Sequence, residues 1–563
     1  MKKLVLNFIF LFTLCSISVS AYGADVINYD PTNSYCGYTF MQDGIKFMII
    51  NQNSVEIAQD ESYKSFVGNL EFPALVGLNG SVYNVVSIAE FAFADCPYIQ
   101  SVSLPSSLKA IKRGAFRRCT SLSYIYNLGK TVFIGNGAFH ETAWFYNLPD
   151  GPIYINDTTL LTYKGSMPAN AHIVVREGTT RICDGAFEEC TNLASISIPN
   201  SVKYIGEDAF SECTSLRSVK LPEGLTTIEY GTFRGCTSLE SVVLPSSLKT
   251  IDARAFRYCP KLTTISLPNG LERIGTEAFK SCAFTSIKIP SSVNYIGREA
   301  FDYTPWYTNQ PDGPIYINNI LYKYKGSMPE KAHFIVREGT VCISGEAFYR
   351  CENLASVSIP NSVKSIGTWA FSNCTGLTEI KIPSSVTDME SCVFSSCKSL
   401  KSASIYANIP GIENQTFQDC FSLENVYLSS NIKYIDHFAF ENCSNLQFIS
   451  LPTNLKRIGT HAFGGCRSLQ SITIPYSVKY LDSYVFFYCS SLTSIAIPHG
   501  VQSIGKSAFA SCENLNSVTI PNSMVSIDES AFERCGNLNS VVVPYITEYA
   551  PSAFPEHTEI IRK

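Results

Sequence analysis

One short segment recurs along this chain of 563 residues. The segment IPNSVKYIGEDAFSECTSL begins at Ile198, and close copies begin at Ile359, Leu451 and Ile497. When the copies are aligned on one phenylalanine, most steps are 23 residues, two are 22, and two are longer. A fixed period of about 20 to 50 residues is the signature of a solenoid. The aligned residues are Phe93, Phe116, Phe139, Phe187, Phe210, Phe233, Phe256, Phe279, Phe301, Phe348, Phe371, Phe394, Phe417, Phe440, Phe463, Phe486, Phe509, Phe532 and Phe554.

A single unit shows why the segment must be repeated. Leu216, Val219 and Leu221 follow the L-x-x-L-x-L spacing of a leucine-rich repeat, which predicts a short strand with Val219 and Leu221 pointing inward. Pro222 ends that strand because it cannot donate a ladder hydrogen bond. The Ala-Phe-x-x-Cys segment is predicted to be a tight return of one helical turn. Each unit has about seven inward apolar side chains, which only stacked neighbours can bury.

The full repeat is L-x-x-[IV]-x-[IL]-P-x-x-[VL]-x-x-I-x-x-x-A-F-x-x-C, and it recurs in register from about residue 85 to residue 554. This pattern resembles the BspA-like, or Treponema pallidum-type, leucine-rich repeat proteins. The resemblance implies a curved right-handed repeat solenoid with one continuous parallel β-sheet, short β or helical-turn return legs and an N-terminal β cap. Residues 43–92 are similar to the family's lead-in segment. About 21 coils are expected, each adding about 4.8 Å along the stack.

The first residues are typical of a secretion signal. Lys2 and Lys3 precede a mostly apolar stretch, and Ala21-Tyr22-Gly23 fits a cleavage site of small residues. The alternative, an uncleaved anchor, needs a longer apolar segment. We therefore expect a signal peptide at 1–23, a β cap at 24–84, the solenoid at 85–554 and a C-terminal tail at 555–563. The mature chain is expected to be exported, secreted or at the cell surface, without a transmembrane segment.

The two long steps contain a second, duplicated segment, in inserts at about 142–179 and 304–340. Both copies carry Pro-Asp-Gly-Pro, which favours a turn, between aromatic and β-rich stretches. These features predict an irregular coil with a protruding hairpin. Aromatic side chains are enriched among interface anchors, but they are also ordinary packing for such a coil. The candidate binding residues are Trp144, Tyr146, Tyr154, Trp306, Tyr307 and Tyr316.

Sixteen cysteines follow the repeat phenylalanine by three residues. They could form a ladder of disulfides or metal ligands, or a column of buried thiols. Stacked parallel Cβ vectors suit a disulfide poorly, and no histidine recurs in register to complete a zinc site. Buried thiols are therefore the favoured hypothesis. The sixteen are Cys96, Cys119, Cys190, Cys213, Cys236, Cys259, Cys282, Cys351, Cys374, Cys397, Cys420, Cys443, Cys466, Cys489, Cys512 and Cys535.

Motifs of catalysis are weak. The segment from Gly500 to Ser507 satisfies G-x-x-x-x-G-K-S, but it aligns with repeat copies that lack Lys-Ser, so a phosphate site is not expected. His172 and His333 occupy the same place in the two inserts, and no nucleophile or carboxylate is evident beside them. We expect no enzyme activity, no cofactor and no metal site.

Charged and hydroxylated residues recur on the expected surface. Lysines on the return leg could bind sulfated glycans or simply keep the surface solvated. The net charge of −5, with no basic domain, argues against nucleic acid as a partner. The recurring lysines are Lys109, Lys203, Lys249, Lys364, Lys433, Lys456 and Lys479, and the exposed strand positions include Ser195, Ser218, Ser241, Thr264, Ser286, Ser471, Ser494, Ser517 and Ser540.

Solenoids supply extended binding surfaces, so the first hypothesis is an exported binding protein, expected to be a monomer. The resemblance implies adhesion to extracellular proteins or glycans, including host matrix proteins such as fibronectin or fibrinogen, and to mucins or other cells. The second hypothesis is a structural spacer of the cell envelope without a dedicated ligand. The third, an enzyme, requires a titratable pair near Trp144 or Trp306.

Overall fold

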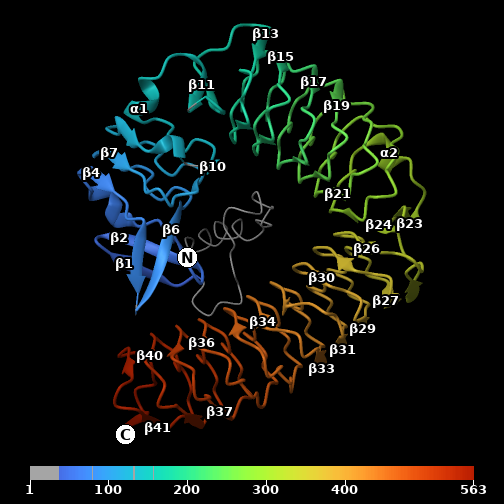
Figure 1. The fold of residues 1–563 in the computed structure, drawn as a ribbon. Helices are drawn as coiled ribbons and strands as arrows, with labels where there is room; N and C mark the ends of the chain where they lie inside the picture. Colours follow the sequence, from blue (N-terminus) through green and yellow to red (C-terminus); the bar gives the residue numbers. More distant parts are fainter. Residues whose placement is uncertain (1–36, 79, 131–132, 156) are drawn as a thin grey trace, which may run out of the picture. The chain divides into compact units, whose positions relative to one another are not determined.

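The structure is a computed structural model that describes residues 37–78, 80–130, 133–155 and 157–563 (Figure 1). The predicted signal peptide and the start of the predicted cap lie outside the described residues. The described residues form the predicted solenoid, and the chain divides into two compact units. The first comprises Met1–Pro268 and Ala278–Ser286, and the second comprises Asn269–Glu277 and Ile287–Lys563.

The first unit begins with the predicted β cap. Strands β1 (Thr39–Gln42), β2 (Ile45–Asn51) and β3 (Ser54–Ile57) pair antiparallel in that order, and β3 then pairs parallel with β6 (Ser81–Ile88). β5 (Leu75–Leu78) pairs antiparallel with β6, and β4 (Gly68–Glu71) begins the strand ladder. The 3-10 helix η1 (Glu61–Ser65) places the Tyr63 ring 4.6 Å from the Phe93 ring. The cap therefore covers the first ring of the phenylalanine column.

Most coils of the first unit contribute one face strand and one short return-leg strand, as the period predicted. Its face strands form two ladders, and its return-leg strands pair in register in the same way. The face strands are β7 (Ile99–Ser103), β9 (Tyr124–Tyr126), β13 (Ala171–Val174), β15 (Leu193–Ser197), β17 (Ser218–Lys220) and β19 (Ser241–Val243). The return-leg strands are β8 (Ala110–Ile111), β10 (Phe133–Ile134), β14 (Arg181–Ile182), β16 (Tyr204–Ile205), β18 (Thr227–Ile228) and β20 (Thr250–Ile251), with η2 (Leu128–Lys130) between β9 and β10.

The second unit repeats this arrangement. Its face strands are β25 (Ala332–Ile335), β27 (Leu354–Ser358), β29 (Glu379–Ile382), β31 (Ser402–Ile405), β33 (Asn425–Leu428), β37 (Ser494–Ala496), β39 (Ser517–Thr519) and β41 (Ser540–Val543). Its return-leg strands are β21 (Arg273–Ile274), β22 (Tyr295–Ile296), β26 (Cys342–Ile343), β28 (Ser365–Ile366), β30 (Asp388–Met389), β32 (Gly411–Ile412), β34 (Tyr434–Ile435), β35 (Arg457–Ile458), β36 (Tyr480–Leu481), β38 (Ser503–Ile504), β40 (Ser526–Ile527) and β42 (Glu548–Tyr549).

The Ala-Phe-x-x-Cys segment is a turn in the structure and not a helical return. Asp208 and Glu212, on either side of Phe210, have φ values of 51° and 60°, in the left-handed region. The three residues between them do not have positive φ. The N–H groups of Asp208, Phe210 and Glu212 donate to carbonyls of the next coil, at 2.8, 2.9 and 2.7 Å. This third ladder compensates the cost of left-handed backbone at residues other than glycine.

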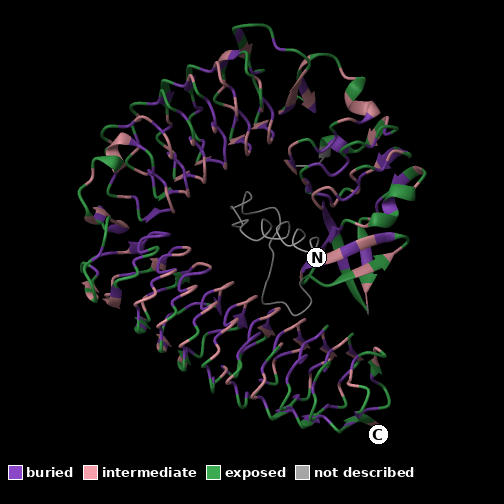
Figure 2. Ribbon diagram, turned by 180° about the vertical axis from the view of Figure 1, so that it is seen from behind, coloured by how far each residue is buried: buried purple, intermediate pink, exposed green. Residues whose placement is uncertain are grey.

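Buried positions recur along the coils of each unit (Figure 2). The core at these positions is a column of stacked phenylalanines and buried aliphatic side chains. In the first unit the Phe187, Phe210 and Phe233 rings follow one another at 5.4 Å with nearly parallel planes. Offset ring stacking adds to the burial of these large apolar side chains. The column explains why the aromatic residue cannot move within the repeat.

The cysteine ladder consists of free thiols in the described part of the chain, which confirms the buried-thiol hypothesis. Cys213, for example, donates to the carbonyl of Phe187 in the preceding coil at 3.1 Å. Cys190 and Cys351, which follow the inserts, have no such bond to a preceding repeat phenylalanine. Thirteen thiols make this contact, at 3.0 to 3.2 Å: Cys119, Cys213, Cys236, Cys259, Cys282, Cys374, Cys397, Cys420, Cys443, Cys466, Cys489, Cys512 and Cys535.

The last nine residues, expected to be a tail, contain strand β43 (Glu559–Arg562). It pairs parallel with β41 and extends the face ladder of the second unit by one strand. The Arg562 guanidinium donates to the carbonyls of Pro544 and Thr547 at 2.9 and 2.8 Å. The segment therefore covers the final coil, whose core would otherwise be open to water.

Candidate binding surfaces

Each insert begins with a single-turn helix in place of a face strand. These helices are α1 (Ala143–Tyr146) and α2 (Pro305–Thr308). The Thr304 hydroxyl caps α2: it accepts from the Tyr307 N–H at 3.1 Å and donates to the Phe301 carbonyl at 2.6 Å. Lys325 closes the other end by donating to the Thr308 carbonyl at 2.7 Å. The helix α1 is capped in the same way. Because a helical turn has no edge with which a neighbouring strand can pair, the two helices interrupt the predicted continuous sheet.

A β-hairpin follows each helix. β11 (Gly151–Ile155) pairs antiparallel with β12 (Thr159–Lys164), and β23 (Gly313–Ile317) pairs with β24 (Ile320–Lys325). The Pro-Asp-Gly-Pro segment leads into the hairpin and is not its tip. The hairpin also does not protrude freely, because β12 and β24 pair parallel with β14 and β26 and serve as the return leg of their own coil.

Aromatic residues of the inserts complete the phenylalanine column. Trp144 and Trp306 pack edge-on against Phe139 and Phe301, with ring centroids 5.3 Å apart in both cases. The N–H of Tyr324 donates to the Ala347 carbonyl at 2.8 Å, which is the bond a repeat phenylalanine makes elsewhere. In the second insert, Trp306 therefore ends the phenylalanine column before it, and Tyr324 takes the first position of the column after it.

The structure does not bring the six predicted binding residues together on one surface. The tryptophans pack on the column, as described. The Tyr154 and Tyr316 hydroxyls accept from the N–H groups of Arg176 and Arg337 at 2.9 and 3.0 Å. Each of these rings also lies 4.3 Å from the guanidinium of the same arginine.

The two remaining predicted residues differ in exposure. The Tyr307 ring is half-buried against Tyr322, at 6.1 Å, with Lys323 and Lys325 near its face. Tyr146 is 63% exposed and is the most accessible of the six. It is the predicted residue best placed to contact a partner.

Sequence reasoning missed the strand that leaves each insert. β13 and β25 each pair on one side, with β15 and β27, and no other described strand pairs with them. Val174 and Ile335, in equivalent positions, are 75% and 78% exposed. The duplicated AHIV and AHFI segments mark these strands as equivalent, but no residue in them indicates which edge is left unpaired.

Histidine fixes the register of these edge strands. The imidazole of His333 forms a hydrogen bond of 2.6 Å with the Ser356 hydroxyl of the neighbouring strand, and His172 makes the same contact with Ser195. The two duplicated histidines are therefore positioned as structural partners of the serine column. Ser195, Ser218 and Ser241 lie directly opposite one another across β15, β17 and β19, as the period predicted.

Two exposed tyrosines lie on the last face strand before the first insert. Tyr124 and Tyr126 on β9 stack with their rings 6.4 Å apart. β9 pairs with β7 on one side, and no other described strand pairs with it. In the first unit, the strands before and after the insert thus each have an unpaired edge and an exposed apolar side chain.

A titratable cluster lies beside Trp306 in the second insert. Asp302 accepts from the Tyr322 hydroxyl at 2.8 Å and lies 2.7 Å from the Lys323 ammonium. Glu346 lies 3.0 Å from Arg298 and 3.8 Å from Lys323. Both carboxylates are held by cations, which is the arrangement of a structural ion-pair network. The first insert lacks it, because His140 and Thr162 stand where the second has Asp302 and Lys323.

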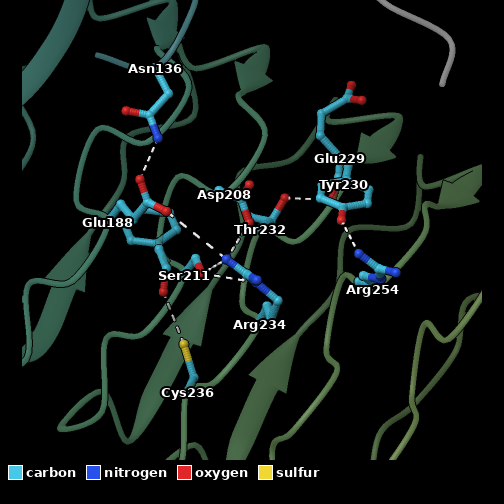
Figure 3. Close-up of polar contacts among 11 residues, drawn as sticks. Asn136, Glu188, Asp208, Ser211, Glu229, Tyr230, Thr232, Arg234, Cys236 and Arg254 are labelled. Atoms are coloured by element: carbon cyan, nitrogen blue, oxygen red, sulfur yellow. Dashed lines mark hydrogen bonds and ion pairs between the residues drawn. The ribbon is translucent and has the colours of Figure 1, made fainter. Parts of the chain in front are cut away.

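A second polar network crosses coils of the first unit (Figure 3). The Arg234 guanidinium donates to the Ser211 hydroxyl at 3.1 and 3.2 Å, and lies 3.4 Å from Asp208 and 4.0 Å from Glu188. The Asn136 amide donates to Glu188. Burial raises the pKa of Asp208, and Arg234 opposes this shift. These bonds link neighbouring coils and hold the Asp208 and Glu188 carboxylates beside a cation.

Comparison with known proteins gives the family. The profile described as "BspA type Leucine rich repeat region" matches residues 36–149, 180–306, 341–466 and 434–561. No curated protein matches the chain. In the described part of the chain, no helix has the length and apolar character needed to cross a membrane.

Three solved structures illustrate the similarity. A leucine-rich repeat protein from Bacteroides ovatus is 23% identical, with 93% of this chain and 100% of that chain covered and a TM-score of 0.30. A leucine rich cell surface protein from Faecalibacterium prausnitzii is 21% identical, with coverage of 92% and 97% and a TM-score of 0.30. The T. pallidum leucine rich repeat protein is 24% identical, with coverage of 39% and 82% and a TM-score of 0.25. The family match spans most of the sequence, and the chain belongs to the BspA-type leucine-rich repeat family.

Proposed function

We propose that this chain is an exported, surface-exposed binding protein that adheres to host matrix proteins, mucins or other cells. Its family membership and solenoid architecture support a binding scaffold rather than an enzyme. The observation that carries the proposal is the pair of open edge strands, β13 and β25, which the two inserts create.

Along one edge of β13, the backbone N–H and C=O groups do not pair with any other described strand. The N–H groups of Ala171 and Val175 donate toward β15, at 2.9 and 3.0 Å. Because alternate residues of a strand face opposite edges, the peptide groups of His172 and Val174 face the other side. β25 has the same geometry, and the peptide groups of His333 and Ile335 face its unpaired edge. An extended peptide segment of a partner protein can add to such an edge as a further strand.

The side chains on these edges favour recognition. Edge strands are commonly protected by lysine, proline or a bulge. β13 and β25 contain no lysine or proline, and their pairings with β15 and β27 each include one register shift. They display Val174 and Ile335, which are among the most exposed aliphatic side chains of the described residues. A partner strand would cover both the peptide groups and part of this apolar surface, and the duplication would allow two segments of one partner to bind.

The test uses purified residues 24–563 and a panel of fibronectin, fibrinogen and mucins. Removing whole inserts would also uncover the phenylalanine columns that Trp144 and Trp306 close, so point variants are preferable. The test variant carries Val174→Lys and Ile335→Lys. The control carries Val243→Lys and Val542→Lys, at exposed positions of β19 and β41. A further variant, Tyr146→Ala, tests whether the most exposed of the six predicted binding residues contributes to binding.

Saturable binding that weakens in the edge variant but not in the control would support the proposal. Binding that persists in the edge variant would move the site to another surface. Absence of binding by the wild-type protein to every member of the panel would contradict adhesion of this kind. It would favour the alternative, a structural spacer of the cell envelope.

A further inference from the structure

The second unit has a basic edge that the proposed adhesion through β13 and β25 does not use. Lys433, Lys456 and Lys479 occupy the same position in three consecutive coils. The Lys456 N–H donates to the Lys433 carbonyl at 2.7 Å, which places these two residues in adjacent coils, about 4.8 Å apart. We define the basic edge as the five turns 406–410, 429–433, 452–456, 475–479 and 498–502.

The ammonium groups of this edge are uncompensated. Among the described residues, none of the three lysine side chains has an ion pair or a hydrogen bond. The five turns contain no aspartate or glutamate, although the chain as a whole has a net charge of −5. In the first unit the equivalent Lys203 donates to the carbonyls of Asn200 and Glu223, and the Glu223 carboxylate lies in the next turn.

Two carboxylates on the return legs of these coils are already engaged. Asp436 lies 2.6 Å from the Arg457 guanidinium. Glu413 accepts from the Tyr434 hydroxyl at 2.5 Å. The field of the three lysines is therefore not cancelled locally, and an anionic ligand experiences it directly.

Neutral groups beside the lysines suit a sugar. Asn408, Asn431 and Asn454 form a second column, in which the Asn431 amide donates to Asn408 at 2.9 Å. These asparagines and Lys433 line a shallow hollow of about 330 Å³. Tyr476, in the turn of Lys479, is 75% exposed and offers an aromatic face for stacking. Amides bind hydroxyl groups, and aromatic faces pack on the apolar side of a sugar ring.

From this arrangement we propose that the basic edge binds a linear anionic polysaccharide. Its sulfate or carboxylate groups would contact Lys433, Lys456 and Lys479, while its hydroxyl groups would contact the asparagine column. A chain of sugar rings repeats its charges at intervals comparable to the spacing of the coils. Three lysines are too few to hold a nucleic acid, whose recognition calls for a larger basic surface.

The experiment measures affinity for immobilised heparin, polygalacturonate, neutral dextran and single-stranded DNA, using residues 24–563. The test variant is Lys433→Gln, Lys456→Gln and Lys479→Gln. The control is Lys381→Gln, Lys398→Gln and Lys401→Gln, which changes the net charge equally at exposed lysines of the same unit. Circular dichroism melts check that both variants fold as the wild type does.

We expect the test variant to raise the Kd for heparin about tenfold or more at low salt, and to reduce its salt dependence, while the control changes little. Binding to polygalacturonate would assign the contacts to carboxylates, and heparin binding alone would assign them to sulfates. Tyr476→Ala is expected to weaken binding, whereas Tyr476→Phe preserves it.

Three results would overturn the proposal. The first is equal loss in the test and control variants, which would indicate non-specific charge. The second is binding to single-stranded DNA as tight as to the polysaccharides. The third is no wild-type binding to either anionic polysaccharide. Because Val174→Lys and Ile335→Lys lie outside the basic edge, they leave glycan binding unchanged, and failure here is distinct from failure of the edge-strand proposal.

Discussion

The thiol of Cys443 donates a hydrogen bond of 3.2 Å to the backbone carbonyl of Phe417, one coil earlier. Both residues are completely buried. The Phe417 carbonyl also accepts from the Cys420 N–H at 3.2 Å, so the thiol supplies the second hydrogen bond of a buried oxygen, a bond that contributes about 0.5–1.5 kcal/mol. The cysteine column is a set of links between coils, made without any covalent bond.

Cys443→Ala should lower the free energy of unfolding by about 1–2 kcal/mol, because it opens a small cavity and removes one of the two hydrogen bonds that the Phe417 carbonyl accepts. Urea denaturation followed by circular dichroism measures this change. Cys190→Ala is the control, since Cys190 is only partly buried. Equal destabilisation by the two substitutions would contradict a role for the hydrogen bond.

The ladder thiols should resist alkylation in the native protein at pH 8. Burial raises the pKa of Cys119 and of Cys535 to about 12, so almost no thiolate is present at that pH. Mass spectrometry after iodoacetamide treatment should find both unlabelled in the folded protein. Both should be labelled in denaturant without a reductant. Failure to label the denatured chain would reveal disulfides.

Glu229 makes the first unit sensitive to alkaline pH. Burial, with Asp252 and Glu207 nearby, raises its pKa from 4.5 to about 8. Because the folded state holds this proton more tightly than the unfolded state, protonation of Glu229 favours folding, and the full contribution is present below pH 4.5. The contribution is lost progressively as the pH rises from 4.5 to about 8.

Glu229→Gln should therefore raise the free energy of unfolding at pH 8.5 by about one to a few kcal/mol relative to the wild type, and change it little near pH 4.5. Urea denaturation at the two pH values tests this, with the exposed Glu240→Gln as the control. A Glu229→Gln effect that is independent of pH would contradict the explanation.

At the left-handed turn positions, substitution by glycine should raise the stability of the protein, which is the opposite of its usual effect. Ser396 has a φ of 60°, and Gly465 occupies the same place three coils later. Ser396→Gly should stabilise the protein by about 0.5–1 kcal/mol, because glycine adopts this conformation without strain. Ser402→Gly, in strand β31, should destabilise it by a similar amount. Thermal melts of the two variants should move in opposite directions.

Substitution of an insert tryptophan should reduce the stability of the protein, whereas substitution of Tyr146 should not. Trp306→Ala should cost about 2–4 kcal/mol, because it removes the edge-on cover of Phe301. Tyr146→Ala should change stability by less than about 0.5 kcal/mol, since its side chain is 63% exposed. Denaturant unfolding of both variants tests the contrast. A large loss of stability in Tyr146→Ala would show that this residue is structural as well.

The phenylalanine period predicted the coils, the strand positions and the inward residues, because stacking requires the same apolar side chain at the same place in every unit. It did not predict the left-handed turns. The residues that adopt them are as different as Asp208, Glu212 and Ser396, and nothing in their chemistry marks the conformation. The backbone ladder between coils imposes it on whatever residue stands there.

The inserts were harder to interpret than the repeats. The aromatic content around Trp144 and Trp306 was recognised, but its function in closing the column depends on the helices α1 and α2, whose sequences show no helical period. The sequence did not predict the open edges at Val174 and Ile335. Whether an edge is unpaired depends on what lies beside the strand, and the residues of the strand itself do not encode it.

The direction of the turn hydrogen bonds has a consequence for biosynthesis. The N–H of Phe509 donates forward to Ala531, and that of Phe532 donates forward to Ala553. A coil therefore acquires the acceptors for these amides only when the coil after it has been synthesised. Until the next coil has folded against them, these amides bind water.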